Sequence, residues 1–292
     1  MKKIEDVLEL NLLSNETRQN IIKMLYLAKS GHPAGPLGLA DLFTVLYFNI
    51  MNHDPTNPNW DKRDRFVLSN GHVCPVLYAS LARAGYFPIE KLDTLRKLGS
   101  PLQGHPHKGP LPGIENSSGP LGQGISQAVG MAIVGKRENA AWKVYCVLGD
   151  GELNEGQVWE ALLLAAKYKL DNLVAVIDRN DIQIDGTSDD VLPLEPLGEK
   201  FRSFGCVVVE VDGNDVSALL RAFKTAHKVK NKPTILIANT IPGKGVSFME
   251  GKFEWHGRPP NEDEKNNALA ELKTLRSKLE THGSKLDLEG KQ

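Results

Sequence analysis

The chain has 292 residues, of which 41% are hydrophobic and 24% are charged, as in an ordinary globular protein with a sizeable core. Its 35 basic and 36 acidic residues nearly balance, so the net charge gives no reason to expect binding to nucleic acid or to a membrane surface. Three scattered cysteines without a CxxC pair argue against a disulfide framework and for a reducing compartment. Because a signal-like start and a membrane-length apolar run are also lacking, we expect a cytoplasmic protein.

The first predicted elements are helices separated by breaks rich in glycine, proline and asparagine. Apolar residues recur at helical spacing over residues 5–30, and Gly31-His32-Pro33 ends that helix. The pattern then predicts a helix at Leu37–Ile50, a loop at 54–64, a short strand at 66–68 and a helix at 75–85.

Residues 99–124 form the least regular stretch, with many glycines and prolines. A loop of this length inside a compact domain is usually functional or disordered. The helix predicted from Ile125 carries small residues on one face, namely Gly124, Ala128, Ala132 and Gly135. Such a stripe lets another backbone approach closely, either in ordinary helix packing or at an interface between subunits.

The middle of the chain alternates strands with helices. The predicted strands are Val144–Leu148, Leu173–Ile177, Val207–Val211 and Thr234–Asn239, and the predicted helices include Gln157–Tyr168 and Val216–Lys228. This alternation predicts an α/β fold with a doubly wound, mostly parallel sheet flanked by helices. We expect one domain over residues 1–260 and a charged helical tail over residues 261–292.

Polar residues follow two of the predicted strands. Asp150 lies in Gly149-Asp150-Gly151 after one strand, and Asn180 follows the next strand, one strand–helix–strand unit later. If these strands are neighbours, both side chains point into the crevice at the carboxyl ends of the sheet. Their oxygens, with a backbone carbonyl near Ile182, suit a hard cation that takes its other ligands from a phosphate. Gly-Asp-Gly by itself is also a common turn.

The motifs together resemble the amino-terminal half of transketolases. Gly-Asp-Gly followed about thirty residues later by Asn resembles the thiamine-diphosphate signature. The match runs from roughly residue 10 to residue 257 and includes, in family order, Ser30-Gly31-His32-Pro33, Ser69-Asn70-Gly71-His72, Gly104-His105-Pro106 and Gly119-Pro120-Leu121-Gly122-Gln123-Gly124. The resemblance implies a thiamine-diphosphate-binding fold.

The resemblance also implies cofactors and site residues. The implied cofactors are thiamine diphosphate and Mg²⁺ (or Ca²⁺ or Mn²⁺), and the implied metal ligands are Asp150, Asn180 and the carbonyl of Ile182. The implied cofactor-binding residues are His72, Gly119, Pro120, Leu121, Gly151, Glu152, Glu155 and Asn180. The implied catalytic residues, which surround the substrate, are His32, His105 and His256. Glu155 and Glu160 resemble the acidic residues that link the cofactor sites of a dimer.

Histidines suit this chemistry because an imidazole moves protons near neutral pH. The remaining His53, His227 and His282 are expected to be structural or surface residues. Lys244, in Gly243-Lys244-Gly245, either lies near the cofactor or belongs to a surface loop, and Cys74 is expected to be a buried thiol rather than a nucleophile. Two departures from the family pattern, His107 and Val73-Cys74, bear on substrate preference.

The implied activity is transfer of a two-carbon ketol unit from a ketose phosphate to an aldose phosphate, as in the pentose phosphate pathway. Full-length transketolases are about twice as long and carry a following pyrimidine-binding domain, which this sequence does not show. We therefore expect the partner to be a separate carboxy-terminal transketolase subunit, in an α2β2 heterotetramer.

Several other functions stay open. They are a split thiamine enzyme acting on other ketoses, a deoxyxylulose-phosphate synthase-like enzyme, and a non-catalytic thiamine-diphosphate-binding regulatory subunit. The run of histidines argues against the α chain of a 2-oxoacid dehydrogenase. A magnesium-nucleotide binder is disfavoured because no GxxxxGK[ST] motif occurs.

Overall fold

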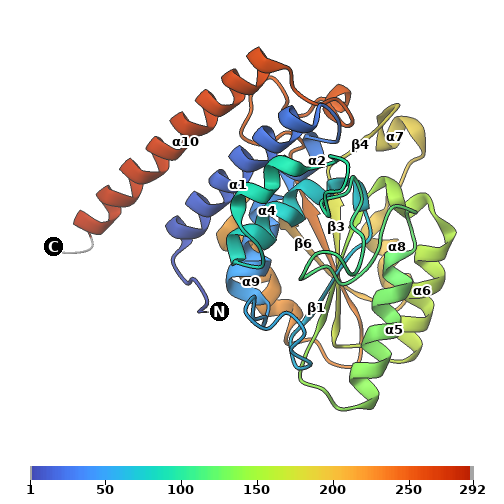
Figure 1. Cartoon of the computed structure of the whole chain (residues 1–292). Helices are drawn as coiled ribbons and strands as arrows, with labels where there is room; N and C mark the ends of the chain where they lie inside the picture. Colours follow the sequence, from blue (N-terminus) through green and yellow to red (C-terminus); the bar gives the residue numbers. More distant parts are fainter. Residues whose placement is uncertain (1, 290–292) are drawn as a thin grey trace.

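The computed structural model describes residues 2–289, and side chains as far as residue 281. Five parallel strands form one sheet in the order β1-β2-β3-β7-β6 (Figure 1). They are β1 Arg65–Leu68, β2 Val144–Gly149, β3 Leu173–Arg179, β7 Thr234–Asn239 and β6 Val207–Asp212. The predicted parallel α/β fold is confirmed, and no predicted strand end moves by more than two residues.

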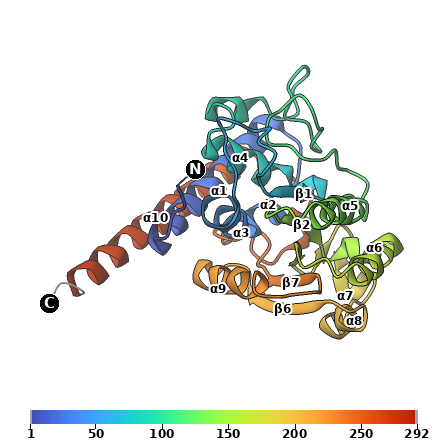
Figure 2. The same ribbon diagram turned by 90° about the horizontal axis from the view of Figure 1, so that it is seen from below.

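Helices cover both faces of the sheet because side chains alternate along each strand. In β3, Val174 and Val176 share one core with α1, α3, α4 and α9. Ala175 and Ile177 share a second core with α5, α6 and α8. Figure 2 shows α5 and α6 on one side of the sheet and α1, α3 and α4 on the other. The helices are α1 Val7–Ala28, α3 Ala40–Val45, α4 Cys74–Ala84, α5 Gly124–Arg137, α6 Gly156–Lys167, α8 Leu197–Ser203 and α9 Val216–Ala226.

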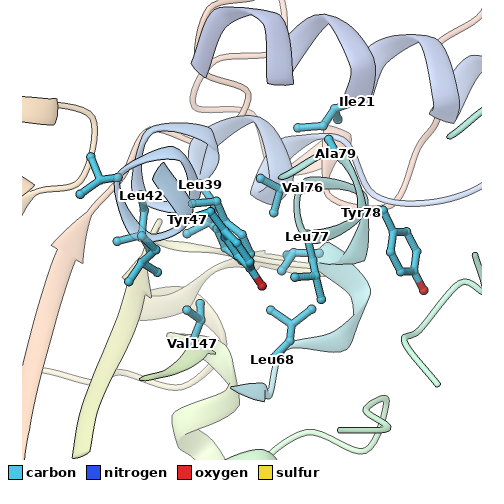
Figure 3. Packing of buried hydrophobic residues seen from close by; sticks show 14 of the residues in the cluster. Ile21, Leu39, Leu42, Tyr47, Leu68, Val76, Leu77, Tyr78, Ala79 and Val147 are labelled. Atoms are coloured by element: carbon cyan, nitrogen blue, oxygen red, sulfur yellow. The ribbon is translucent and has the colours of Figure 1, made fainter. Parts of the chain in front are cut away.

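The helix predicted at Leu37–Ile50 is broken into three parts. They are α2 Ala34–Gly38, α3 and a π-helical turn at Leu46–Ile50. A Cβ on Gly38 would lie 2.9 Å from the carbonyl oxygen of Ile241, so this backbone needs a glycine to approach the segment after β7. In Figure 3, Leu68 and Val147 of the sheet point toward this helical layer, which includes Leu39 and Tyr47.

The small-residue stripe of α5 faces the sheet. Gly124, Ala128, Ala132 and Gly135 are all buried. A Cβ on Gly135 would lie 2.6 Å from the Trp142 ring, and one on Gly124 would lie 2.6 Å from Cβ of Ser69. The stripe therefore serves packing within the domain, and the alternative of an interface between subunits on this face is wrong.

The last helix, α10 Glu262–Glu289, lies beside α1 (Figure 1). Ala268 and Leu272 are fully buried, and Asn15 Nδ2 donates to the Leu272 carbonyl at 3.0 Å. Arg276 also forms an ion pair with Glu16. The expected division into a domain at 1–260 and a tail at 261–292 stays a prediction, and residues 290–292 lie outside the described part.

The carboxyl edge of the sheet carries short elements in place of long helices. They are the 3-10 turns Gly71–Val73 and Gly151–Asn154, the antiparallel pair β4 Ile182–Gln183 and β5 Gly186–Thr187, and α7 Ser188–Val191. Two further 3-10 turns are Ile89–Thr94 and Phe253–Trp255. Between residues 2 and 289, no helix has the length and apolar character that crossing a membrane requires.

Candidate active site

Asp150 and Asn180 emerge at the same edge of the sheet. β2 and β3 are neighbours, and Gly149 lies beside Asp178 in their parallel register. Asp150 follows Gly149 directly, and Asn180 lies two residues after Asp178. The strand adjacency that the sequence interpretation required is therefore present at the carboxyl ends, where ligands bind in doubly wound sheets.

The Asp150 carboxylate is 2% exposed and is surrounded by donors. One oxygen accepts the Gly151 N–H at 2.8 Å. The other accepts the Asp181 N–H at 2.7 Å, Arg179 Nη1 at 3.0 Å and Ser188 Oγ at 3.1 Å. Burial raises the pKa of Asp150, and these donors oppose that rise by stabilising the charged form. The site thus holds a fixed, buried carboxylate.

Asp178 fixes the orientation of the Asn180 amide. Asn180 Nδ2 donates to Asp178 Oδ2 at 2.7 Å, which distinguishes the amide oxygen from the nitrogen. That oxygen accepts the Ile182 N–H at 3.1 Å. Thr240 Oγ1 donates to the other oxygen of Asp178, whose pKa burial raises to about 7.

The oxygen atoms of these residues suit a hard cation that takes its remaining ligands from a bound phosphate. Asp150, Asn180 and the Ile182 carbonyl would offer only oxygens, which Mg²⁺ prefers. No group of three or more His, Cys, Asp or Glu side chains suited to a metal occurs in the described part of the chain. A cation at this edge would therefore need further oxygens from a ligand.

A cavity of about 410 Å³ opens at this edge of the sheet. The predicted site residues that line it are His32, His72, His105, Gly119, Leu121, Asp150, Gly151, Glu152, Asn180, Ile182 and His256. Of the other predicted residues, Pro120 lies between two lining residues, whereas Glu155 and Glu160 are exposed and do not line it. Most of the residues predicted from scattered motifs are thus brought to one cavity.

Three imidazoles form a triangle in this cavity. The ring centroids of His32, His72 and His256 lie 5.1–5.5 Å apart. Burial and then neighbouring imidazoles lower the pKa of His32 to about 4 and that of His72 to about 3. Burial also lowers the pKa of His256 and His105. All four rings are neutral near pH 7, so each presents one proton donor and one acceptor.

Asn70 is a cavity residue that the sequence interpretation did not single out. Its side chain is 1% exposed, and neither its oxygen nor its nitrogen has a hydrogen-bond partner in the structure. His32 Nδ1 is likewise buried without a partner. Unpaired buried polar atoms are costly, so these groups fit a cavity built for a polar ligand. The only signal in the sequence was the position of Asn70 between two motif residues, Ser69 and Gly71.

Glu152 ties together the loops that build the cavity. It is 2% exposed, and its carboxylate accepts from Ser69 Oγ, from the Gly122 N–H at 2.7 Å and from the Gly149 N–H at 3.0 Å. Ser69 Oγ also accepts the Gly124 N–H at 3.1 Å. These bonds join the segments that carry Ser69, Gly122 and Gly149 at the edge of the cavity. The predicted contact of Glu152 with the cofactor stays a prediction.

Gly119 needs its glycine identity next to His105. Its φ is +149°, a conformation that side chains rarely adopt, and a Cβ there would lie 3.6 Å from the His105 ring. The positive φ, and not a lack of space beside the imidazole, is therefore what requires glycine here.

Several residues whose roles the sequence left undecided lie outside the cavity. The Cys74 thiol is fully buried, and burial raises its pKa to about 12, so it is no nucleophile. Lys244 lies 3.7 Å from Glu250 and does not line the cavity. His53 bonds to the Tyr47 carbonyl and Tyr86, and His227 to Tyr145, as expected of structural residues. The His282 side chain lies outside the described part.

The fold and the cavity define a doubly wound α/β protein with a buried carboxylate, an oriented amide and four histidines at the carboxyl edge of its sheet. The family described as "Transketolase, thiamine diphosphate binding domain" matches residues 11–278, and the chain belongs to this family.

Similar proteins include chains that are named as transketolase subunits. One belongs to the apulose-4-phosphate transketolase of Phocaeicola vulgatus and is 42% identical over 271 residues, which cover 93% of this chain and 96% of that protein. "6-deoxy-6-sulfo-D-fructose transketolase subunit SqwG" of Clostridium sp. (strain MSTE9) is 42% identical over 268 residues, covering 92% and 98%. The structure also resembles transketolase from Campylobacter jejuni, with a TM-score of 0.86 at 36% identity. That match covers 91% of this chain but only 43% of the Campylobacter chain, so this chain spans less than half of that enzyme.

Proposed function

We propose that the chain is the thiamine-diphosphate-binding subunit of a transketolase that transfers a two-carbon ketol unit from a ketose phosphate to an aldose phosphate. The observation that carries the proposal is the triangle of His32, His72 and His256 in the cavity lined by Asp150 and Asn180. Family membership supports the cofactor. The imidazoles favour an enzyme over a non-catalytic binder.

Asp150, Asn180 and the Ile182 carbonyl are the proposed ligands of Mg²⁺. His72, Gly151 and the segment Gly119-Pro120-Leu121 are the proposed cofactor contacts, and Asn70 joins them because its buried amide lacks a partner. Glu152 holds the surrounding loops. Glu155, exposed at the start of α6, is kept with Glu160 as a residue that links cofactor sites across an assembly.

Bound thiamine diphosphate supplies an electron sink for cleavage of a carbon–carbon bond. The histidines supply proton transfer at the sugar oxygens. A neutral ring of His32, His105 or His256 can accept the proton of the donor hydroxyl and return one to the carbonyl oxygen of the acceptor. An imidazole N–H can also stabilise the developing negative charge on that oxygen.

We propose that a separate pyrimidine-binding subunit completes the enzyme, as an α2β2 heterotetramer in the cytoplasm. Two relatives that this chain matches over nearly their whole length are named as transketolase subunits, which supports a partner chain. The three cysteines are free and buried, which fits a reducing compartment.

A second candidate differs only in the donor sugar. The same two relatives are named for apulose 4-phosphate and for 6-deoxy-6-sulfo-D-fructose. A ketose outside the pentose phosphate pathway, with a phosphate or sulfonate group, is therefore the alternative substrate.

The test is co-expression with a candidate partner subunit, followed by a transfer assay with thiamine diphosphate and Mg²⁺. The donor panel contains pentose and hexose ketose phosphates, apulose 4-phosphate and 6-deoxy-6-sulfo-D-fructose. We expect transfer by the complex, and the best donor decides between the two candidates. In His32→Ala, kcat should fall about 100-fold while cofactor affinity stays unchanged. Cofactor binding without transfer from any donor would indicate a regulatory subunit.

A further inference from the structure

Arg96 lies between the two turns that carry His32 and His105. Its Nη1 donates to Ser30 Oγ at 2.9 Å, two residues before His32. Its Nη2 lies 3.4 Å from the carbonyl oxygen of Gly104, the residue before His105. One guanidinium group therefore connects two Gly-His-Pro segments that are far apart in the sequence.

The same guanidinium packs against the glycines of both turns. A Cβ on Gly104 would lie 2.8 Å from Arg96 Cζ and 2.9 Å from Nε. A Cβ on Gly31, whose φ is +122°, would lie 3.6 Å from Nε. The absence of a side chain at Gly104 is thus what admits the guanidinium, and any larger residue there would displace it.

The backbone of Arg96 is held in an uncommon conformation. Its φ is +59°, which costs a non-glycine residue on the order of 1 kcal/mol. The Arg96 N–H donates to the Leu102 carbonyl at 2.8 Å and so closes the loop that leads to Gly104. Strain of this kind persists only where surrounding contacts fix it, and the two turns provide those contacts.

The turn before His105 is also fixed from its other side. Cys74 Sγ lies 3.1 Å from the Gly104 carbonyl, and Tyr78 OH donates to the Gln103 carbonyl at 2.9 Å. Both donors come from α4, so Arg96 is the contact that ties this turn to the turn of His32. The His32 turn has no equivalent bond to α4 in the hydrogen bonds found among the described residues.

Arg96 is a cation without a carboxylate partner. It takes part in none of the ion pairs found within the described part of the chain. Its charge lowers the pKa of His105 after burial does, and that of His32 after burial and His256. The other titratable groups that face His32 are His105 and His72. An uncompensated cation here disfavours an imidazolium in either turn.

We propose that Arg96 is a positioning residue whose guanidinium holds the His32 and His105 turns in a fixed relation and places a positive charge beside both imidazoles. The inference rests on the proposed function for its catalytic meaning. The contacts of Arg96 exist in the chain whatever its substrate. Arg96 acts through the two histidines and is not among the residues that line the cavity.

The test compares Arg96→Gln, Arg96→Lys and the control Lys97→Gln. Lys97 is the neighbouring exposed cation, so its variant removes one charge from the same loop. NMR titration of the histidine ring protons in the full chain gives each pKa without an activity assay. In Arg96→Gln, the pKa of both His32 and His105 should rise, whereas Lys97→Gln should leave both near their wild-type values.

Arg96→Lys separates charge from geometry. A lysine retains the charge but cannot bond both turns with one planar group, so the histidine pKa values should stay close to wild type. In the complex with the partner subunit, kcat/KM should nevertheless fall about tenfold. The acidic limb of the pH–rate profile should move to higher pH only in Arg96→Gln.

Unchanged histidine pKa values in a folded Arg96→Gln chain, or equal shifts in Lys97→Gln, would overturn the inference. If Arg96→Gln does not fold, wild-type kcat/KM in Arg96→Lys would overturn it instead. Failure of the proposed function would be a separate result. In that case the complex shows no ketol transfer, while Arg96→Gln still raises the pKa values of His32 and His105.

Discussion

Asp150 is a carboxylate whose surroundings are arranged for charge. It is almost fully buried, yet two backbone N–H groups, a hydroxyl and Arg179 donate to it. A neutral amide of the same shape would lose the charge and present N–H groups to donors whose hydrogen bonds the carboxylate accepts. A change at Asp150 should therefore affect binding of the proposed cofactor.

Asp150→Asn should raise the Kd for thiamine diphosphate with Mg²⁺ by more than about 100-fold, because the amide cannot neutralise the cation. The measurement is the thermal shift on cofactor addition, since a ligand at about 100 times its Kd stabilises a protein by about 2.7 kcal/mol. Asp189→Asn is the matched control, because Asp189 is an exposed carboxylate 3.8 Å from the same Arg179. Wild-type affinity in Asp150→Asn would exclude it as a metal ligand.

Outside the candidate active site, the titration of His227 makes the stability of the fold depend on pH. Its Nε2 lies 2.8 Å from Tyr145 OH, and burial, with smaller effects of Lys143 and Lys3, lowers its pKa to about 4. In the unfolded chain this histidine has an ordinary pKa of 6.5. Between pH 6.5 and about pH 4 it is therefore protonated in the unfolded chain but neutral in the folded chain. Folding therefore loses stability as the pH falls from 6.5 toward 4, and no such loss occurs above 6.5.

Replacing His227 by Gln should remove this loss. The difference in unfolding free energy between about pH 7 and about pH 5.5 should shrink by roughly 1 kcal/mol in His227→Gln. Urea unfolding at the two pH values measures it. Tyr145→Phe is the control, because it deletes the hydrogen bond and leaves the titrating ring, so its pH difference should stay close to that of wild type.

At the scale of elements, the sequence was informative where polar connections bound an apolar run or where one face of a helix meets solvent. The strands and α6 were predicted well because buried runs alternate with polar connections. The segment Ala34–Ile50 is buried on every side, so its sequence carries no periodic signal of where the helix breaks. At the break, the Gly38 backbone approaches Ile241, and that contact joins distant parts of the chain.

Two glycines of α5 make a matched test of this packing. Gly124→Ala should destabilise the chain by about 1–3 kcal/mol, because the new Cβ would lie 2.7 Å from Cα of Ser69, which cannot move aside. Gly130→Ala, at an exposed position with nothing within 4 Å, should stabilise it by about 0.5–1 kcal/mol. Urea unfolding measures the free energy of unfolding of both variants. Equal effects would mean that α5 does not pack on the sheet as described.

At the scale of the whole molecule, the sequence predicted the adjacency of Asp150 and Asn180 more directly than it predicted the rest of the cavity. One strand–helix–strand unit separates Asp150 from Asn180, and fold class alone makes such residues neighbours. His32, His72 and His256 come from three unrelated loops, so only family resemblance linked them beforehand. The unpaired amide of Asn70 and the bridging contacts of Arg96 depend on tertiary structure, and the sequence marks only that Asn70 lies in the motif Ser69-Asn70-Gly71-His72.

Four large apolar side chains are exposed on and next to α5 and α6. Val134, Leu163, Leu164 and Tyr168 are 48%, 58%, 41% and 41% exposed on these two packed helices. Single exposed apolar residues are ordinary, and we expect these four to contact a second chain because they lie on neighbouring helices. Glu155 and Glu160, expected to link cofactor sites across a dimer, lie at the start of α6 and within it.

The double variant Leu163→Glu/Leu164→Glu should therefore weaken assembly and raise the dissociation constant of the complex about tenfold or more, because two charges would be buried without partners. Light scattering after size-exclusion chromatography measures the assembly. Leu98→Glu is the control. Leu98 is fully exposed and lies between the 3-10 turn Ile89–Thr94 and α5, outside the two helices. Leu163 and Leu164 are 58% and 41% exposed in the single chain, so the double variant should weaken the assembly by more than it destabilises the fold. A complex of unchanged mass and affinity would place the contact between subunits on another face and leave Glu155 and Glu160 without their expected role.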